Sequence, residues 1–229
     1  MKRDYLSVVY SEKRAPKTDY PRRLTGYLFD RFNMKEGQRL LEVGCGRGEF
    51  LKAFQELKLD CKGVDLSDHC VKDGGADTFT CVDITKESLP FVDNSFDYVY
   101  HKSLIEHLRS PERLMKETYR VLKPGGMVII LTPDWGSQMK VFFEDITHEK
   151  PYDARALEDA LKIYGFKEEG AELFYQLPAI WRFPALRMLS FVIRSLISTP
   201  LARKITRATG IKFFRWSVEL MVLGYGKKR

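Results

Sequence analysis

The chain has 229 residues, of which 44% are hydrophobic and 30% charged, and its formal net charge is +7. This composition fits one domain with a buried core, perhaps with an appended lobe, and excludes long disordered tracts. No run of about 18 uncharged apolar residues occurs, and residues 1–17 lack the apolar stretch of a signal peptide, so we expect a cytoplasmic protein.

Four cysteines are present, and none forms a CxxC pair; they are Cys45, Cys61, Cys70 and Cys81. We interpret them as reduced thiols of a cytosolic protein. The spacings of histidine and cysteine match no common zinc pattern, so we expect no metal site.

The first periodic segment precedes any strand. Leu24, Tyr27, Leu28 and Phe32 recur at helical spacing. We therefore expect residues 1–36 to form a helical cap over the edge of a sheet or over its ligand cleft.

From residue 39 to residue 166, short apolar runs alternate with helical patterns. We expect strands at 39–43, 61–66, 78–84, 95–101 and 127–132, and helices at 49–57, 110–122 and 153–166. The segments 166–177 and 214–226 also have the pattern of strands. Ser110 and Pro111 have the residue types of a helix start, and Gly165 that of a helix stop. Strands separated by helices favour a parallel sheet covered on both faces.

Three glycines follow the first strand, in the sequence Glu42-Val-Gly-Cys-Gly-Arg-Gly48. The turn between a first strand and its helix is where doubly wound sheets bind nucleotide-like ligands. Asp65 ends the next strand, about 20 residues on, where an acid can bind ribose hydroxyls. The G-x-G-x-G spacing differs from the G-x-G-x-x-G of dinucleotide folds, so hydride transfer is the weakest interpretation.

Four motifs in order carry a family resemblance: LLEVGCGRGEFL, GVDLS, CVDITKESLPFVDNSFDYVYHKSLIEHL and VLKPGGMVIILTP. Together they resemble the class I S-adenosylmethionine-dependent methyltransferases, in the type 11 methyltransferase-domain group, over residues 39–166. The resemblance implies an α/β fold with a doubly wound, Rossmann-like, seven-stranded mixed sheet. It implies a cofactor-binding core at 37–177, a helical insertion at 178–210 and a final strand within 211–229.

The resemblance also implies roles for individual residues in binding S-adenosyl-L-methionine. Glu42 positions the amino-acid end of the cofactor, and the turn of Gly44, Cys45, Gly46 and Gly48 passes beneath it. Asp65 accepts hydrogen bonds from both ribose hydroxyls, and Asp83 meets the adenine amino group. Leu66 and Ile84 enclose the adenine ring, the backbone near His101 meets the methionine amino group, and KPGG turns the chain into the fifth strand.

Methyl transfer from a sulfonium is an in-line displacement, so the protein mainly aligns its reactants. A hydroxyl acceptor would also benefit from a general base, and His101 and His148 are the candidates. We expect His148, in FFEDITHEKPY, to contact the acceptor with Asp145 beside it, although both could instead fix a loop. We interpret His107, within a helical segment, as structural.

The positive charge is concentrated in the last quarter of the chain. Residues 178–229 contain eleven lysines and arginines against one acid, a net charge of +10, whereas the remainder carries −3. In 178–210, Leu186, Leu189, Ile193, Leu196 and Ile197 form one helical stripe with arginines roughly opposite. This segment could be a lid, a dimer contact or a helix at the inner membrane surface.

We therefore predict O-methylation of a small molecule or of a glycan or lipid-linked intermediate, possibly an anionic one. The alternatives are an RNA or protein methyltransferase and a cofactor-binding regulator without catalysis. A nucleic-acid partner is disfavoured because no NPPY-type motif follows the fourth strand, where the chain reads HKSL. The sequence identifies neither the acceptor nor the oligomeric state.

Overall fold

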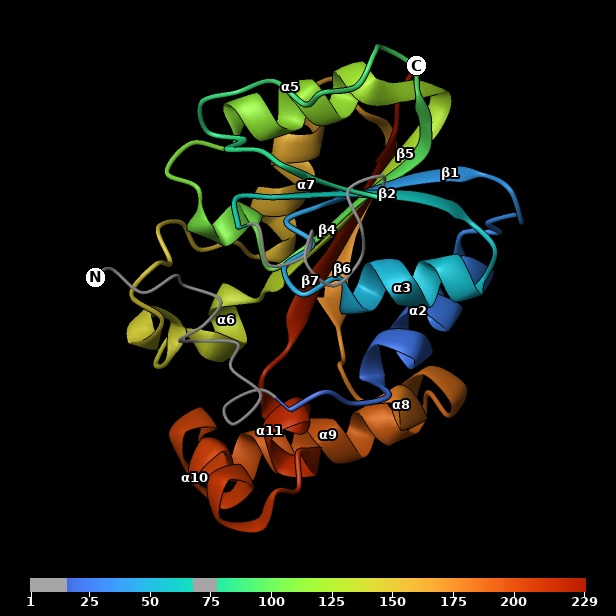
Figure 1. Cartoon of the computed structure of the whole chain (residues 1–229). Helices are drawn as coiled ribbons and strands as arrows, with labels where there is room; N and C mark the ends of the chain where they lie inside the picture. Colours follow the sequence, from blue (N-terminus) through green and yellow to red (C-terminus); the bar gives the residue numbers. More distant parts are fainter. Residues whose placement is uncertain (1–15, 68–77) are drawn as a thin grey trace. The chain divides into compact units, whose positions relative to one another are not determined.

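The structure is a computed structural model that describes residues 16–67 and 78–229. Its strands form a seven-stranded sheet in the order β3-β2-β1-β4-β5-β7-β6 (Figure 1). The strands are β1 (Arg39–Val43), β2 (Asp60–Asp65), β3 (Phe79–Cys81), β4 (Phe96–Lys102), β5 (Leu122–Pro133), β6 (Lys167–Phe174) and β7 (Met221–Lys227). β1 pairs in parallel with β2 and β4, β2 with β3, and β6 pairs antiparallel with β7. The predicted doubly wound mixed sheet is confirmed.

The chain divides into two compact units. Of the described residues, 16–67, 78–102, 112–128 and 228–229 belong to the first, and 103–111 and 129–227 belong to the second. The division into a cap, a core, an insertion and a final strand stays a prediction. The two units are described separately below.

In the first unit, α2 (Tyr20–Arg31), α3 (Glu49–Glu56) and α5 (Glu112–Val121) accompany β1 to β4. The predicted face of α2 is the buried one, because Leu24 and Leu28 are fully buried while Tyr27 and Phe32 are half-buried. α2 and α3 lie side by side (Figure 1). At their junction the rings of Tyr20 and Phe50 meet edge to face, with centroids 6.4 Å apart.

Two boundaries near α5 differ from the expectation. The helix begins at Glu112, two residues after Ser110, and β5 begins at Leu122, so KPGG lies inside the strand. The N–H of Gly125 donates to the Lys228 carbonyl, and the N–H of Lys228 donates to Gly126, both at 2.8 Å. These bonds to the end of the chain extend the strand beyond the apolar run.

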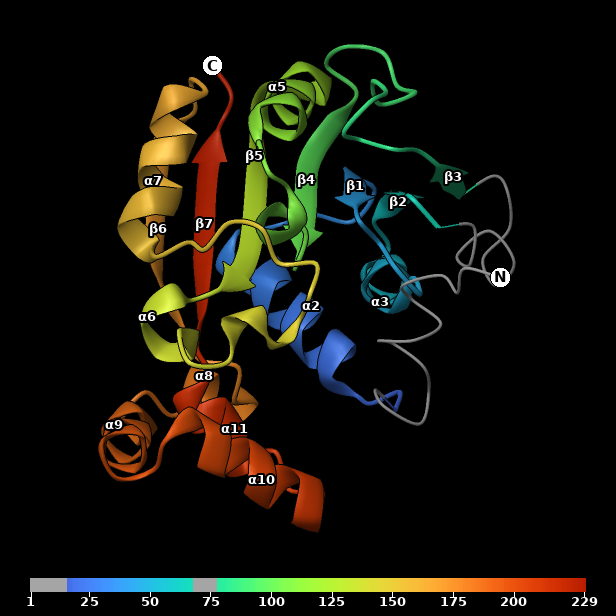
Figure 2. The same ribbon diagram turned by 90° about the vertical axis from the view of Figure 1, so that its left-hand side faces the viewer.

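The second unit contains η1 (Ile105–His107), α6 (Trp135–Gln138), η2 (Phe142–Glu144) and α7 (Ala154–Ile163) before β6. α7 packs along β6 and β7 (Figure 2). Asp153 caps its start, with Oδ1 accepting from the Ala156 N–H at 2.7 Å. Gly165 follows its end with a φ of +89°, as the sequence predicts for a helix stop.

The prediction of a strand over residues 214–226 is wrong for its first part. Residues Phe213–Val218 form α11, and β7 begins only at Met221. Aromatic residues favoured a strand, but local bonds favour the helix. The Trp216 N–H donates to the Lys212 carbonyl, and Arg215 pairs with Glu219 four residues later.

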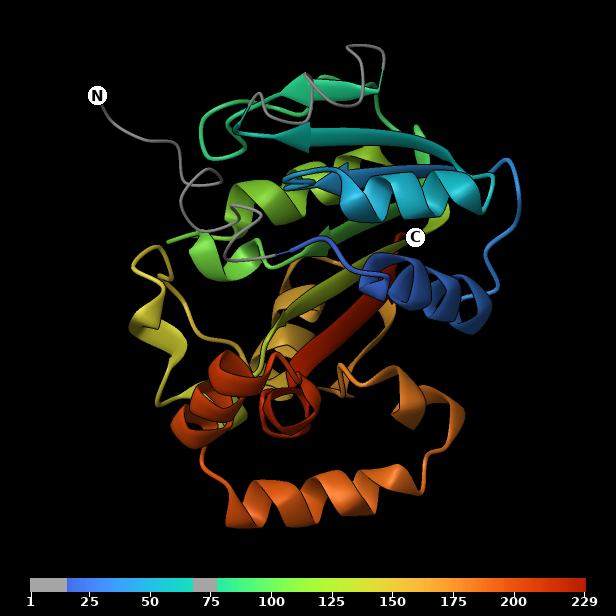
Figure 3. The same ribbon diagram turned by 60° about the horizontal axis from the view of Figure 1, so that its bottom comes forward.

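Residues 178–210 form three helices: α8 (Pro178–Arg182), α9 (Leu186–Leu196) and α10 (Thr199–Thr209). α11 lies beside both α9 and α10 (Figure 3). A small core of Ile193, Ala202 and Val218 joins them. Ile193 and Ile197 are therefore packed members of the predicted stripe, whereas Leu189 and Leu196 are 48% and 79% exposed.

None of the helices within residues 16–67 and 78–229 is long and apolar enough to cross a membrane.

Glu219 is the buried charge of this helical segment. Its carboxylate accepts from Arg203 of α10 and from the Nε of Arg215, the latter at 2.8 Å. Arg203 also reaches Glu144 at 2.6 Å. The carboxylate thus ties α10 and α11 to the start of β7, and breaking a buried ion pair leaves its partner uncompensated.

We expect Glu219→Gln to lower the free energy of unfolding by about 3 kcal/mol, because it leaves the largely buried Arg203 guanidinium without its main countercharge. Urea denaturation at pH 7 measures the change. Glu168→Gln is the matched control, since its pair with Lys227 is exposed and its loss should cost at most about 1 kcal/mol. Equal effects of the two substitutions would contradict the role given to Glu219.

Candidate functional site

The turn after β1 is built from glycines in left-handed conformations. Gly44, Gly46 and Gly48 have φ values of +75°, +52° and +71°, which other residues rarely adopt. The N–H groups of Gly44 and Cys45 both donate to the Val64 carbonyl of β2, at 2.8 and 3.1 Å. A Cβ on Gly48 would lie 2.8 Å from the ring of Phe79. The turn is therefore fixed to the neighbouring strands and requires glycine at position 48.

Asp65, at the carboxyl end of β2, is bonded to this turn. One oxygen of its carboxylate accepts from the Gly46 N–H at 2.7 Å, and the other accepts from the Ser67 N–H at 2.9 Å. A carboxylate has about four acceptor positions in all. These backbone bonds set the orientation of the carboxylate at the place where the sequence predicts the ribose hydroxyls.

Glu42 is a buried acid of β1, aligned in register with Gly63 of β2 and Tyr100 of β4. Burial, and after it the charge of Glu42, raises the pKa of the Cys61 thiol to about 12. The same two causes raise the pKa of Tyr100. Glu42 thus places a carboxyl group inside the sheet, two residues before the glycine turn.

The loops predicted to hold the adenine are brought together by backbone bonds. The Val82 N–H donates to the Asp65 carbonyl at 2.8 Å, so the residues that follow β2 and β3 are neighbours. Leu66 is 69% exposed and Ile84 is buried. The carboxylate of Asp83 accepts from the Thr85 N–H at 3.0 Å and from Lys86 Nζ at 2.8 Å, and hydrogen bonds from these two residues lower its pKa.

The cysteines near this loop are thiols. Cys45, Cys61 and Cys81 form no disulfide with one another, and Cys70 lies outside the described residues.

His101, in β4, is fully buried. Neither ring nitrogen has a hydrogen-bond partner within the described part of the chain. Burial lowers the pKa of the ring to about 3. His101 is therefore neutral at pH 7 and is a weak base.

His148 lies in the second unit, after η2, where it contacts a second histidine. The rings of His148 and His107 have centroids 4.8 Å apart in an edge-to-face arrangement. Nδ1 of His148 is 2.7 Å from the Phe142 carbonyl oxygen. Asp145 accepts from the hydroxyl of Thr147 at 2.7 Å, and that hydroxyl oxygen is 2.9 Å from Nδ1 of His107.

Glu106 completes this cluster. It is fully buried and accepts from the Thr132 hydroxyl at 2.9 Å. Sequence reasoning assigned His107 to structure and did not join Glu106 to His148. The motifs IEHL and DITHEKPY were the available signal, but 40 residues separate them and only the fold brings them together.

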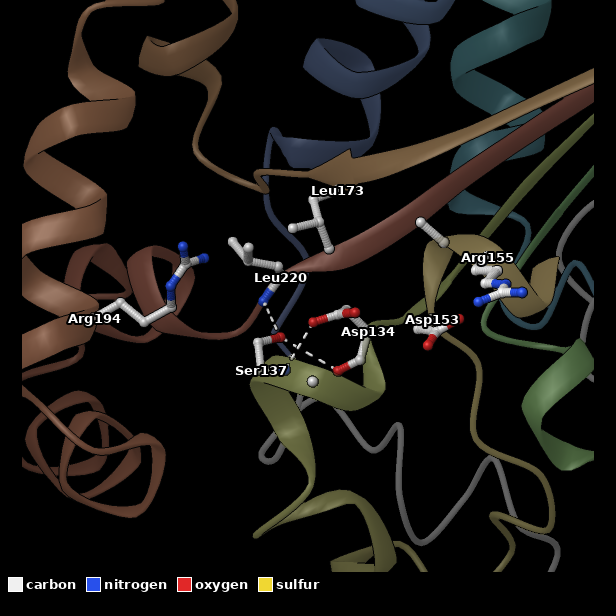
Figure 4. A pocket seen from close by; sticks show the side chains of 9 residues that line it. Asp134, Ser137, Asp153, Arg155, Leu173, Arg194 and Leu220 are labelled. Carbon is white, nitrogen blue, oxygen red and sulfur yellow. Dashed lines mark hydrogen bonds between the residues drawn. The ribbon is translucent and has the colours of Figure 1, made fainter. Parts of the chain in front are cut away.

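A pocket of about 430 Å³ lies elsewhere in the second unit, and the sequence did not predict it. Figure 4 shows Ser137 between Asp134 and Leu220, with Arg194 and Arg155 on opposite sides. The Leu220 N–H donates to the Ser137 hydroxyl at 3.1 Å, and Asp134 Oδ2 accepts from the Ser137 N–H at 2.7 Å. The guanidinium groups at its sides suit a ligand with an anionic or polar group.

Comparison with protein families gives a match over residues 12–169 to a family described as a methyltransferase domain. Phosphoethanolamine N-methyltransferase 3 of Arabidopsis thaliana is 32% identical over 162 residues, which cover 62% of this chain and 31% of that protein. Demethylmenaquinone methyltransferase of Bacillus subtilis is 28% identical over 155 residues, which cover 62% of this chain and 66% of that protein. The matches thus span less than two thirds of either relative.

Solved structures share the fold. Phosphoethanolamine N-methyltransferase 2 of Haemonchus contortus, in complex with S-adenosyl-L-methionine, aligns with a TM-score of 0.68 at 20% identity, covering 99% of this chain and 59% of that one. A SAM-dependent methyltransferase of Archaeoglobus fulgidus aligns with a TM-score of 0.64 at 23% identity, covering 98% and 100%. At these identities the likeness concerns the fold alone.

The burial of His101 predicts a specific pH dependence of stability. Its pKa is about 3 when folded and about 6.5 when unfolded, so the unfolded state takes up the proton first. Above pH 6.5 the ring is neutral in both states. As pH falls from 6.5 towards 3, only the unfolded state is protonated, and the free energy of unfolding falls by about 1.4 kcal/mol per pH unit.

Urea denaturation of the wild type and of His101→Gln at pH 7 and at pH 4.5 tests this. Between pH 7 and pH 4.5 the wild type should lose about 2 to 3 kcal/mol more unfolding free energy than His101→Gln loses. A difference independent of pH would show that the ring titrates normally.

Proposed function

Because this chain belongs to the methyltransferase-domain family of class I S-adenosylmethionine-dependent enzymes, we propose that it methylates a hydroxyl of a small-molecule, glycan or lipid-linked acceptor. The resemblance drawn from the sequence is confirmed by the family match over residues 12–169, and S-adenosylmethionine is the cofactor of that family. The acceptor class is the part that we propose.

The observation that carries the cofactor-binding part of the proposal is the carboxylate of Asp65 bonded to the glycine turn. The bond from the Gly46 N–H at 2.7 Å holds it at the end of β2, where it can accept from the two ribose hydroxyls of the cofactor. The left-handed glycines let the backbone approach the ligand closely. We propose that the first unit binds the cofactor through these groups and through Glu42 and Asp83.

We propose that the second unit supplies the contact with the acceptor through His148. In the reaction the acceptor oxygen bonds to the methyl carbon, the carbon–sulfur bond breaks and its electron pair returns to sulfur. The hydroxyl proton has to leave as well. His101 suits this role poorly, because a base with a pKa of about 3 holds a proton weakly. His148 is half-buried and belongs to a polar cluster.

A small acceptor is supported by the relatives, since the names of two of them specify phosphoethanolamine and demethylmenaquinone rather than RNA or protein. Neither name specifies a hydroxyl acceptor, so the chemistry of the accepting atom rests on the histidine cluster alone. RNA or protein methylation and cofactor binding without catalysis are the outcomes against which the proposal is tested.

We expect Asp65→Asn to weaken binding of S-adenosylhomocysteine at least tenfold, because an amide cannot accept from both ribose hydroxyls with two charged oxygens. Isothermal titration calorimetry measures the affinity. Asp60→Asn, at the opposite end of β2 and paired with the exposed Arg39, is the matched control and should bind normally. Normal binding by Asp65→Asn would contradict the assigned cofactor site.

Transfer is measured with S-adenosylmethionine labelled in its methyl group and a cell extract divided into small-molecule, lipid, RNA and protein fractions. The proposal requires label in the small-molecule or lipid fraction, as a methyl ether. Label in RNA or protein, or cofactor binding with no transfer to any fraction, would replace it with one of the alternatives.

We also propose a partner for the C-terminal helices: α9 and α10 contact an anionic membrane surface. Exposed apolar side chains stand on these helices beside exposed cations; they are Met188, Leu189, Phe191, Val192, Leu196 and Leu201, with Arg187, Lys204 and Arg207. Ile193 and Ile197 of the stripe pack inward, so its exposed members Leu189 and Leu196 are the ones available to a surface. Apolar side chains flanked by cations are typical of interfacial helices.

We expect the protein to co-sediment with vesicles that contain anionic phosphatidylglycerol and not with vesicles of phosphatidylcholine alone, because both charge and apolar burial contribute. Leu196→Glu should abolish this binding. Ile163→Glu, an equally exposed apolar position on α7, should retain it. Sedimentation that responds to neither substitution, or that is absent, would exclude the membrane contact.

A further inference from the structure

Glu106, His107 and His148 form a group of metal-ligand type within the second unit. One ligand atom from each lies within 4.8 Å of the other two. Glu106 is fully buried, and both histidines are half-buried. Two imidazoles and one carboxylate are the donor set of many zinc sites that keep one coordination position open.

The hydrogen bonds of His148 fix which of its nitrogens carries the proton. Nδ1 lies 2.7 Å from the carbonyl oxygen of Phe142. A carbonyl can only accept, so Nδ1 of His148 donates. In the neutral ring the lone pair is then on Nε2.

The same assignment follows for His107 through a chain of three side chains. Asp145 Oδ1 accepts the Thr147 N–H at 3.0 Å and lies 2.7 Å from the Thr147 hydroxyl. Since a carboxylate accepts, the hydroxyl gives its single proton to Asp145. Its oxygen must therefore accept from Nδ1 of His107 at 2.9 Å, which leaves the lone pair of that ring on Nε2 also.

We propose that Nε2 of His107, Nε2 of His148 and one carboxylate oxygen of Glu106 bind a divalent cation of borderline softness, with Zn²⁺ as the best fit. Donation of Nδ1–H to a carbonyl or a hydroxyl is the usual support of a histidine ligand. The Thr132 hydroxyl bonded to Glu106 supports the carboxylate in the same way. Ligand atoms about 2 Å from a tetrahedral ion lie about 3.3 Å apart, so rotation of the side chains must close the group slightly.

The charges around the group favour a cation. Glu106 is one anion of the site, and Asp145 lies close enough to act on His107. Lys150, whose N–H donates to the Glu106 carbonyl, is exposed and directs its ammonium over the ring of Tyr152.

The role of the cation rests on the function proposed above. In the open position it would bind the acceptor oxygen and lower the pKa of the hydroxyl, whose proton then passes to solvent. The contact proposed above between His148 and the acceptor would then be made through the cation that His148 holds. Binding of the cation itself requires no acceptor and can be tested without one.

The test titrates the EDTA-treated full-length protein with Zn²⁺ by calorimetry and with Co²⁺ by visible absorption. We expect one equivalent to bind, with the intense ligand-field bands of a four-coordinate Co²⁺. His148→Ala and Glu106→Gln should each weaken Zn²⁺ binding at least tenfold. Glu149→Gln, an exposed acid next to His148, is the control and should bind as the wild type does.

Circular dichroism of each metal-free variant shows whether it is folded. If Glu106→Gln is unfolded, His148→Asn at the half-buried ligand replaces it in the comparison. An absence of binding at 100 µM Zn²⁺ (about 5 kcal/mol in binding free energy), or equal affinity in all folded variants, would overturn the site. Because no acceptor or cofactor is present, either result would leave the proposed methyl transfer untouched.

Discussion

The bond between the Asp65 carboxylate and the Gly46 N–H is the constraint on which the rest of the candidate site depends. It joins the end of β2 to the turn after β1, so the Asp65 carboxylate lies beside glycines in left-handed conformations. The packing of Phe79 against Gly48 adds a steric condition, because any side chain at position 48 would meet that ring. A ligand with hydroxyl groups is thus met by a preorganised acceptor rather than by a flexible loop.

A second preorganised arrangement stands in the other unit, where a hydrogen-bond chain sets the tautomers of two histidines. Asp145 takes the proton of the Thr147 hydroxyl, and Thr147 in turn accepts from His107. The backbone carbonyl of Phe142 does the same for His148. Asp145 was expected beside His148 in the acceptor contact, and its place in this chain gives it a positioning role.

The C-terminal segment shows how a single buried charge can organise helices that expose apolar side chains. Glu219 holds Arg203 and Arg215, and the small core around Ile193 leaves most of α9 outside it. Packing within α9, α10 and α11 buries few side chains and leaves the leucines of α9 exposed, so packing does not account for these leucines. This favours a role at a surface over that of a lid closed by its leucine stripe.

The sequence by itself determined the order of the strands and of the longer helices up to residue 174, the glycine turn and the acid at the end of β2. Those features depend on local patterns: apolar runs, turn glycines and residue spacing. It failed at residues 213–218, where bonds between residues four apart outweighed the β-propensity of aromatics. Only the tertiary structure placed Glu106 and His107 against His148 and excluded His101 from water. Contacts across 40 residues and the burial of a ring depend on how the elements pack, and no local pattern records that.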